Sequence, residues 1–226
     1  MNYLKQFSKL IHEKKNLLKC IFTTLLCQLI ATSLVFIIIY RNASSKRKSQ
    51  SNRFGLMYGL SFLILGIVLI ICMTTIRMSF TQRLILFTLF SILQGLFLGF
   101  SLRYIQPNAI LSALLFTVLL FFMMLIFGFI LVYYQMDLSW LGIILFFLLL
   151  GLIAVRLVSI FFPYSKKREQ LLTTFALLLF SIYIIYDTNT ILLRYDSVKY
   201  HRDCILGALD YYLDIINIFV NSIKAE

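Results

Sequence analysis

The sequence predicts an all-α membrane protein, a seven-span helical bundle with a polar, acid-bearing seventh helix. Of its 226 residues, 61% are hydrophobic and 13% are charged, a balance that soluble domains do not have. The hydrophobic residues fall into runs that can cross a bilayer, since one crossing takes about 20 of them. The loops between these runs are short, which excludes a large domain outside the membrane.

Six hydrophobic runs are long enough to span and nearly free of charge. They lie at 17–40, 56–76, 84–102, 109–134, 138–162 and 171–193. A basic N-terminal tail, 1–16, precedes them, and we expect 17–223 to form a single transmembrane domain. In the third run, Gly95 and Gly99 form a GxxxG pattern, which is more typical of close helix packing than of function. In the fifth, we expect Arg156 to extend its charge to the lipid headgroups.

The seventh segment, 204–222, is helical by pattern but polar on one side. Asp210, Asp214, Asn217 and Asn221 follow at i, i+4, i+7 and i+11, so they form one stripe along a helix face. A carboxylate facing lipid costs at least ~2.5–3.5 kcal/mol. We therefore expect the stripe to face the bundle interior or water.

The charge of the chain points to lipid and not to nucleic acid. The net charge is +12, and the basic residues cluster beside the hydrophobic runs, as they do next to lipid headgroups. No basic segment interleaved with aromatic residues lies outside the runs, so we expect no nucleic-acid partner. The four cysteines show no CxxC and no histidine at ligand spacing, so neither a zinc site, a disulfide framework nor a bound cofactor is expected.

Basic residues are spread over the chain, whereas acidic residues are concentrated in one segment. Five of the nine lie between Asp187 and Asp214. The connection 194–203 allows only a tight return, so the two flanking helices pack side by side and these two carboxyls can face each other. Such a pair titrates as a unit. With one proton shared it holds the helices together, and with both groups ionised it repels and can bind calcium transiently.

Other interpretations of these residues stay open at this stage. Asp187 can be a helix-end residue at the interface, and Asp210 can be a structural acid that supports Asp214. Asn217 and Asn221 can serve helix packing alone. Arg77, at the end of the second run, is a candidate latch for the carboxyl pair because of its position at a membrane edge.

Two stretches resemble a known signature. Tyr186-Asp187-Thr188-Asn189-Thr190-Ile191 and Ala208-Leu-Asp-Tyr-Tyr-Leu-Asp-Ile-Ile-Asn-Ile-Phe219 are similar to the C-terminal motifs of the transmembrane Bax-inhibitor motif family, which includes the Lifeguard and Golgi anti-apoptotic proteins. The resemblance implies a cytosolic N-terminus and a pH-sensitive calcium leak that suppresses apoptosis. It also implies that Asp187 and Asp214 are the proton sensor, with the basic latch falling on Arg77. Gln94, where many relatives carry a carboxylate, and Arg156 depart from the family pattern.

Two alternatives remain beside the channel. One is a non-conducting membrane scaffold that regulates cell-death or stress proteins. The other is an intramembrane aspartyl protease, which the run Leu206-Gly-Ala-Leu-Asp210 argues against because it lacks the second glycine of GxGD; we do not expect an enzyme. Expected partners are lipids, calcium and protons, with death-regulating membrane proteins or self-association as further possibilities. The expected location is the endoplasmic reticulum or Golgi membrane in a eukaryotic cell and the inner membrane in a bacterium.

Overall fold

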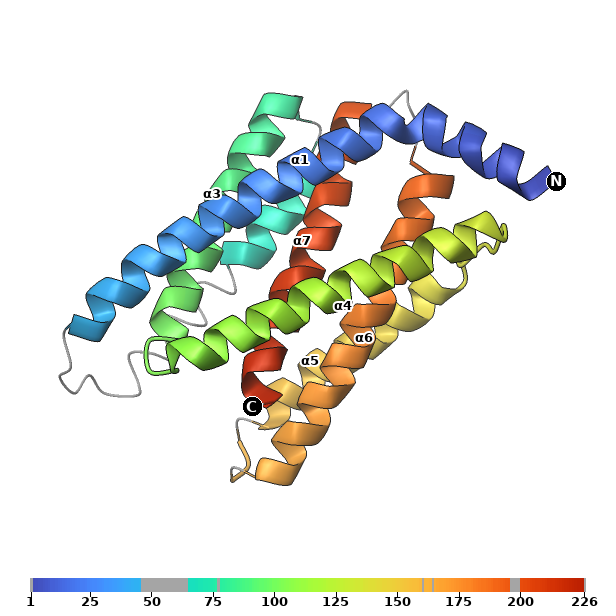
Figure 1. Ribbon diagram of the computed structural model, residues 1–226. Helices are drawn as coiled ribbons and strands as arrows, with labels where there is room; N and C mark the ends of the chain where they lie inside the picture. The colour runs from blue at the N-terminus through green and yellow to red at the C-terminus, as the bar shows by residue number, and fades with distance from the viewer. Residues whose placement is uncertain are drawn as a thin grey trace. The chain divides into compact units, whose positions relative to one another are not determined.

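The protein is helical in nearly all of the chain that the structure describes. This computed structural model describes residues 2–45, 65–76, 78–159, 161–163, 165–195 and 200–225 (Figure 1). Seven helices lie in these ranges: α1 (Asn2–Ser45), the helix Leu65–Thr75, α3 (Phe80–Ser101), α4 (Pro107–Tyr133), α5 (Leu141–Ser159), α6 (Lys166–Leu193) and α7 (Tyr200–Ala225). Five of them, α1 and α3 to α6, are long and apolar enough to cross a membrane. The predicted class, an all-helical multi-pass membrane bundle, is confirmed.

The helix ends depart from the predicted runs where a capping residue sets them. The run predicted at 84–102 begins earlier, at Phe80, because Ser79 caps α3. The Ser79 hydroxyl accepts from the Gln82 backbone N–H (3.3 Å), and the Gln82 side chain accepts from the Ser79 N–H (2.9 Å), a reciprocal capping box. The basic tail at 2–16 is helical and continuous with the first run. Part of the second predicted run, 56–64, lies outside the described residues.

The chain divides into two compact units, and two helices contribute to both. The α4–α6 unit comprises Met1–Asn16, Pro107–Ser197 and Asp210–Glu226. The α1–α3 unit comprises Leu17–Gln106 and Val198–Leu209. The beginning of α1 and the larger part of α7 therefore belong to the first unit, and the remainder of each belongs to the second.

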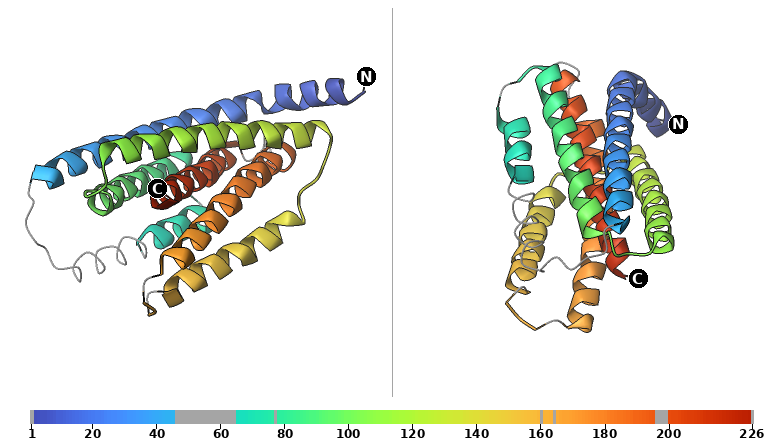
Figure 2. Two further views of the ribbon diagram at one scale, coloured as in Figure 1. Left: turned by 60° about the horizontal axis from the view of Figure 1, so that its bottom comes forward. Right: turned by 90° about the vertical axis from the view of Figure 1, so that its left-hand side faces the viewer.

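In the α4–α6 unit, α6 packs against both α4 and α5. Figure 1 and the left view of Figure 2 show α5 and α6 side by side. A Cβ atom added at Gly128 of α4 would lie 2.6 Å from Cβ of Thr188 of α6, so glycine is what permits this close approach. Asn189 of α6 donates to the Met136 carbonyl (2.7 Å) and accepts from the Leu138 N–H (3.2 Å). These two bonds attach the α4–α5 turn to α6.

In the α1–α3 unit, α1 and α3 are joined by glycine contacts and by a hydrogen bond from a side-chain hydroxyl to a backbone carbonyl. A Cβ atom at Gly95 would lie 2.6 Å from the Thr32 carbonyl oxygen, and one at Gly99 would lie 2.6 Å from Cβ of Ile39. The Thr32 hydroxyl also donates to the Ser91 carbonyl across the interface (3.1 Å). The interpretation of the GxxxG pattern as a helix-packing site is thus confirmed.

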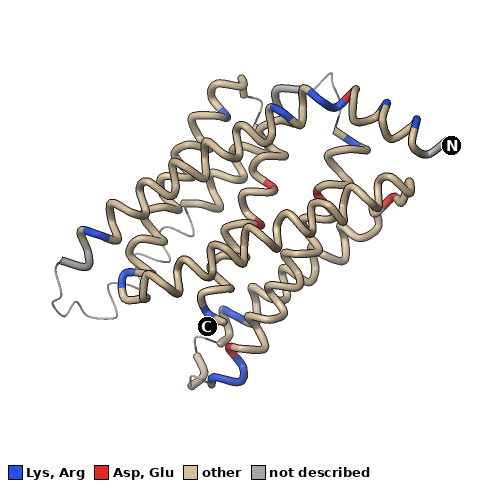
Figure 3. The backbone as a smooth tube through the Cα atoms, in the orientation of Figure 1, with Lys and Arg blue, Asp and Glu red and all other residues tan. Residues whose placement is uncertain are grey.

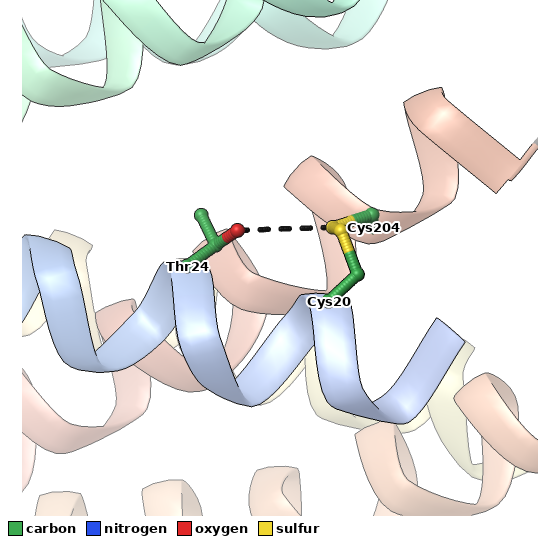
Figure 4. The surroundings of a disulfide bond; sticks show 3 residues. All are labelled: Cys20, Thr24 and Cys204. Carbon is green, nitrogen blue, oxygen red and sulfur yellow. Dashed lines mark hydrogen bonds between the residues drawn. A yellow bond between two sulfur atoms is a disulfide. The ribbon is translucent and has the colours of Figure 1, made fainter. Parts of the chain in front are cut away.

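A disulfide bond between Cys20 of α1 and Cys204 of α7 corrects the prediction for the cysteines (Figure 4). The two Cα atoms are 5.8 Å apart although the residues are separated by 184 positions. The expectation that no disulfide forms was wrong because it depended on local spacing, which carries no information on a pair joined only by the fold. The Thr24 hydroxyl lies 3.8 Å from Sγ of Cys204, and Cys27 and Cys72 are free thiols.

Candidate functional site: an acidic cluster on α6 and α7

Three carboxyl groups of the α4–α6 unit form what we call the acidic cluster: Asp187 on α6, and Asp210 and Asp214 on α7. The side chains of Asp187 and Asp214 are hydrogen-bonded to each other, and Asp210 is close enough to act on both electrostatically. Figure 3 shows acidic positions along α6 and α7, whereas basic positions gather near the ends of helices. The structure therefore brings together the two aspartates that the sequence predicted to face each other.

The polar stripe of α7 is turned toward the protein, as predicted. Asp214 is 4% exposed and Asn221 is 6% exposed, while Asp210 and Asn217 are partly buried. Among the residues that the structure describes, no group hydrogen-bonds Oδ2 of Asp214. Buried polar atoms nearly always have a partner, so this oxygen gives the cluster unused acceptor capacity.

Aromatic and hydroxyl groups fix the helices around the acidic cluster. The Tyr195 hydroxyl donates to Oδ2 of Asp210 (2.8 Å). The hydroxyls of Thr188 and Tyr211 are 2.9 Å apart, and the Tyr211 ring packs edge-on against Phe121 of α4, with centroids 5.6 Å apart. Because these contacts link α7 to α6 and to α4, they hold the register in which the aspartates meet.

This geometry can respond to protonation. An ionised carboxylate is only an acceptor, so a hydrogen bond between Asp187 and Asp214 requires a proton on one of them. When both are ionised the contact becomes a repulsion between like charges. In the described part of the chain, no three His, Cys, Asp or Glu side chains gather to hold a metal ion.

The asparagines of the stripe differ in what they contact. Each side-chain amide donates to the backbone carbonyl one turn earlier, from Asn217 to Leu213 and from Asn221 to Asn217 (2.8 Å each). Oδ1 of Asn221 also accepts from Nη2 of Arg156 on α5 (2.7 Å). Asn217 thus contacts its own helix, whereas Asn221 connects α7 to another.

Two arginines have roles that the sequence did not indicate. Arg156, which the sequence predicted to extend toward the headgroups, donates to Oδ1 of Asn221 (2.7 Å) and lies 3.4 Å from Glu169. Arg83 is 4% exposed and donates to the Met73 carbonyl and to the Ile76 carbonyl (2.8 Å). It satisfies carbonyls that the end of the helix Leu65–Thr75 leaves open. The predicted latch, Arg77, lies outside the described residues.

A further carboxyl group, that of Asp137, lies in the α4–α5 turn and is not part of the acidic cluster. Its surroundings also differ from those of the cluster. The Ser139 hydroxyl and the Ser139 N–H (2.9 Å) both donate to it, and Arg194 lies 3.8 Å away. The hydrogen bonds from Ser139, followed by the charge of Arg194, hold the pKa of Asp137 below its usual value. Asp137 is therefore ionised and solvated at neutral pH.

The fold and the acidic cluster together define a class, the multi-pass helical membrane proteins that keep carboxyl groups inside the bundle. Residues 14–223 match the family described as inhibitor of apoptosis-promoting Bax1. The chain belongs to this family, the Bax inhibitor-1 and Lifeguard membrane proteins. The resemblance seen in the sequence is confirmed. Because the family consists of non-enzymatic membrane proteins, the protease alternative is set aside.

Relatives from plants and yeast are similar over much of the chain. Bax inhibitor 1 of Schizosaccharomyces pombe is 30% identical over 207 residues, which cover 92% of this chain and 74% of the relative. Protein LIFEGUARD 1 of Arabidopsis thaliana is 25% identical over 89% of this chain and 84% of its own length. A BI1-like protein of Arabidopsis thaliana is 29% identical over 63% of this chain, and the match spans only 54% of that relative.

Proposed function

We propose that the protein is a pH-sensitive cation leak channel that conducts calcium across its membrane, modulates intracellular calcium and suppresses apoptosis. Family membership supports the link to apoptosis, since the family description names an inhibitor of apoptosis-promoting Bax1. The channel itself is supported by the acidic cluster, because carboxyl groups buried among membrane helices are expensive and are found mainly where ions or protons are handled.

The observation that carries the proposal is the hydrogen bond between Asp187 and Asp214. While one proton is shared, the pair draws α6 and α7 together and carries a single negative charge, so it attracts a cation less strongly than the fully ionised pair does. When the proton leaves, the two charges repel, and their oxygens become hard ligands of the kind that calcium prefers. Calcium conduction should therefore rise as pH increases through the neutral range.

Other residues have supporting roles in this proposal. Asp210, Asn217 and Asn221 provide polar atoms along the same face of α7, whereas Arg77, which lies outside the described residues, stays a predicted latch. Calcium binds Asp187 and Asp214 only in passing. In a eukaryotic cell the membrane would be that of the endoplasmic reticulum or Golgi, and in a bacterium the inner membrane.

The test is calcium flux into liposomes that contain the purified protein, measured with an enclosed dye from pH 6 to pH 8. We expect flux in the wild type to increase with pH, and both Asp187→Asn and Asp214→Asn to lose that dependence. Asp137→Asn is the matched control, because it makes the same chemical change at an exposed turn. A pH response that survives in both cluster variants would refute the gate.

A non-conducting scaffold is the second candidate, favoured by the family description itself, which names the inhibition of another protein. Under this hypothesis the chain binds death-regulating membrane proteins or a second copy of itself, and the aspartates serve packing. Wild-type liposomes would then show no more calcium flux than empty ones. Binding to a partner would be retained in Asp214→Asn.

A further inference from the structure

A charged cluster joins three helices at the end of the polar stripe. Arg156 comes from the last turn of α5, Glu169 from the first turn of α6 and Lys224 from the last turn of α7. Nη1 of Arg156 lies 3.4 Å from Oε1 of Glu169, and Nζ of Lys224 lies 3.7 Å from the same oxygen. We call these three residues the basic-end cluster. All belong to the α4–α6 unit.

The basic-end cluster is continuous with the stripe that carries the acidic cluster. Asn221, the last residue of the stripe, is buried and accepts from Nη2 of Arg156 (2.7 Å). Along α7, the stripe thus begins at carboxyl oxygens that attract cations and ends at a guanidinium that repels them. Arginine does not lose its charge in proteins, so this repulsion is present at every pH at which the acidic cluster titrates.

The charge balance of the basic-end cluster favours exclusion of cations. Two basic side chains share a single carboxylate, so the group is net positive when all three are ionised. The side chains of Arg156 and Glu169 are only 27% and 31% exposed, and partial burial weakens the screening that water and salt give to surface charges. A cation that reaches Asn221 therefore meets a poorly screened positive charge.

We propose that Arg156 is a specificity-determining residue, a fixed positive barrier at one end of the α7 stripe that limits how much cation passes. Asn221 orients the guanidinium, and Glu169 sets the height of the barrier by offsetting part of its charge. This inference depends on the proposed cation leak. Arg156 would limit the amount of cation flux through the proposed channel, whereas Asp187 and Asp214 would determine how that flux responds to pH.

The test measures calcium flux and the calcium-to-chloride permeability ratio in proteoliposomes at pH 8. Arg156→Gln should raise calcium flux about tenfold, since removing a nearby unit charge changes the barrier by at least ~1.4 kcal/mol. Arg156→Lys, which keeps the charge, should stay near wild type. Glu169→Gln should lower the flux about threefold and shift permeability toward chloride, because the barrier loses its offsetting charge.

The opposite directions of these flux changes distinguish a charge barrier from a cluster that only holds the helices together. If the basic-end cluster only holds the helices together, Arg156→Gln and Glu169→Gln both remove the same ion pair and change flux in the same direction. That result would overturn the proposal, as would an Arg156→Lys variant that behaves like Arg156→Gln. Arg168→Gln is the matched control, because Arg168 lies at the start of α6 and donates to the Pro163 carbonyl (2.9 Å).

Two further controls keep the inference distinct from the proposed function and from misfolding. Thermal unfolding in detergent establishes that each variant is folded, and only folded variants with equal incorporation into liposomes are compared. Wild-type protein without calcium flux would refute the leak and this inference with it. A wild-type flux that depends on Asp187 and Asp214 but is the same in Arg156→Gln would refute the barrier alone.

Discussion

The interactions that hold the helices together inside one unit differ from those inside the other. In the α1–α3 unit the helices are joined by glycine contacts, hydroxyl-to-carbonyl bonds, arginine-capped carbonyls and the disulfide between Cys20 and Cys204. In the α4–α6 unit, glycine packing is accompanied by the acidic cluster and by ion pairs such as Arg156–Glu169 and Arg194–Asp137. Each unit is a packed set of membrane helices, but within the residues that the structure describes only the α4–α6 unit places a pair of carboxyl groups in mutual contact.

This difference shows which interactions the packing of membrane helices requires and which have another purpose. Membrane helices associate through close contacts of small residues and a few hydrogen bonds, and the α1–α3 unit meets those needs without a pair of carboxyl groups in contact. The carboxyls of the α4–α6 unit are unfavourable in a membrane, so packing does not explain them. Stability should therefore depend most on variants of the α1–α3 unit, and pH response on variants of the α4–α6 unit.

Loss of the disulfide should have the largest effect on stability. Cys20→Ser opens a cross-link between residues 184 positions apart, and a loop of that length contributes about 5 kcal/mol in the chain-entropy description. We expect a clear drop in the midpoint of thermal unfolding in detergent. The pH response of calcium flux in folded Cys20→Ser protein should be that of the wild type.

Cys27→Ser is the control for this prediction, since Cys27 lies on the same helix, is exposed and is a free thiol. It should unfold like the wild type. A reducing agent should lower the midpoint of the wild type to that of Cys20→Ser and leave Cys20→Ser itself unchanged. Equal midpoints for oxidised wild type and Cys20→Ser would show that the cross-link does not stabilise the α1–α3 unit.

Filling the contact between α1 and α3 should be the next most damaging change. In Gly95→Leu, the new Cβ would lie 2.6 Å from the backbone oxygen of Thr32, which cannot move aside as a side chain can. We expect a loss of about 3 kcal/mol from overpacking, measured by thermal unfolding. Gly151→Leu on α5 is the matched control, because nothing lies within 4 Å of the added Cβ. Similar losses in both variants would mean that the close contact at Gly95 does not decide the result.

The sequence predicted the helices and the polar face of α7 from local patterns, and it predicted the contact between Asp187 and Asp214 from the short connection 194–203, which makes α6 and α7 pack side by side. Runs of apolar residues locate the spans, and the spacing of Asp210 and Asp214 places them on one face of α7 without knowledge of any neighbour. The Cys20–Cys204 bond and the Arg156–Asn221 contact could not be predicted in this way. Each joins residues on different helices, and no periodicity within one helix encodes which residue of another it meets.

Removing a buried hydroxyl should have a smaller effect, of about 1 kcal/mol. Thr188→Val keeps the shape of the side chain but removes the hydroxyl that lies 2.9 Å from the Tyr211 hydroxyl and donates to the Ile184 carbonyl. The control is Thr74→Val, where an exposed hydroxyl donates only to carbonyls of its own helix. Chemical denaturation should separate the two variants, and an equal loss in both would mean that burial of the hydroxyl does not matter.

The smallest effect is expected from Asp137→Asn, and it should depend on pH. The fold lowers the pKa of Asp137, so the ionised form stabilises the folded state above the unfolded pKa, about 3.9. That contribution disappears as pH falls through the folded pKa. The wild type should thus unfold at a slightly higher temperature than Asp137→Asn at pH 7, and this difference should shrink as the pH falls below the unfolded pKa. A gap that widens in acid would contradict the assignment.

Asp137→Asn also tests whether an acid that stabilises the fold differs from the acids that gate the proposed channel. Asp137 is exposed and titrates in acid, far from the neutral range in which the proposed channel responds. If Asp137→Asn changes stability with pH but keeps the pH dependence of calcium flux, while Asp214→Asn loses that dependence, the response belongs to the pair of Asp187 and Asp214. If both variants shift the flux curve alike, titration of the α4–α5 turn controls conduction, and the contrast between the two units would no longer explain function.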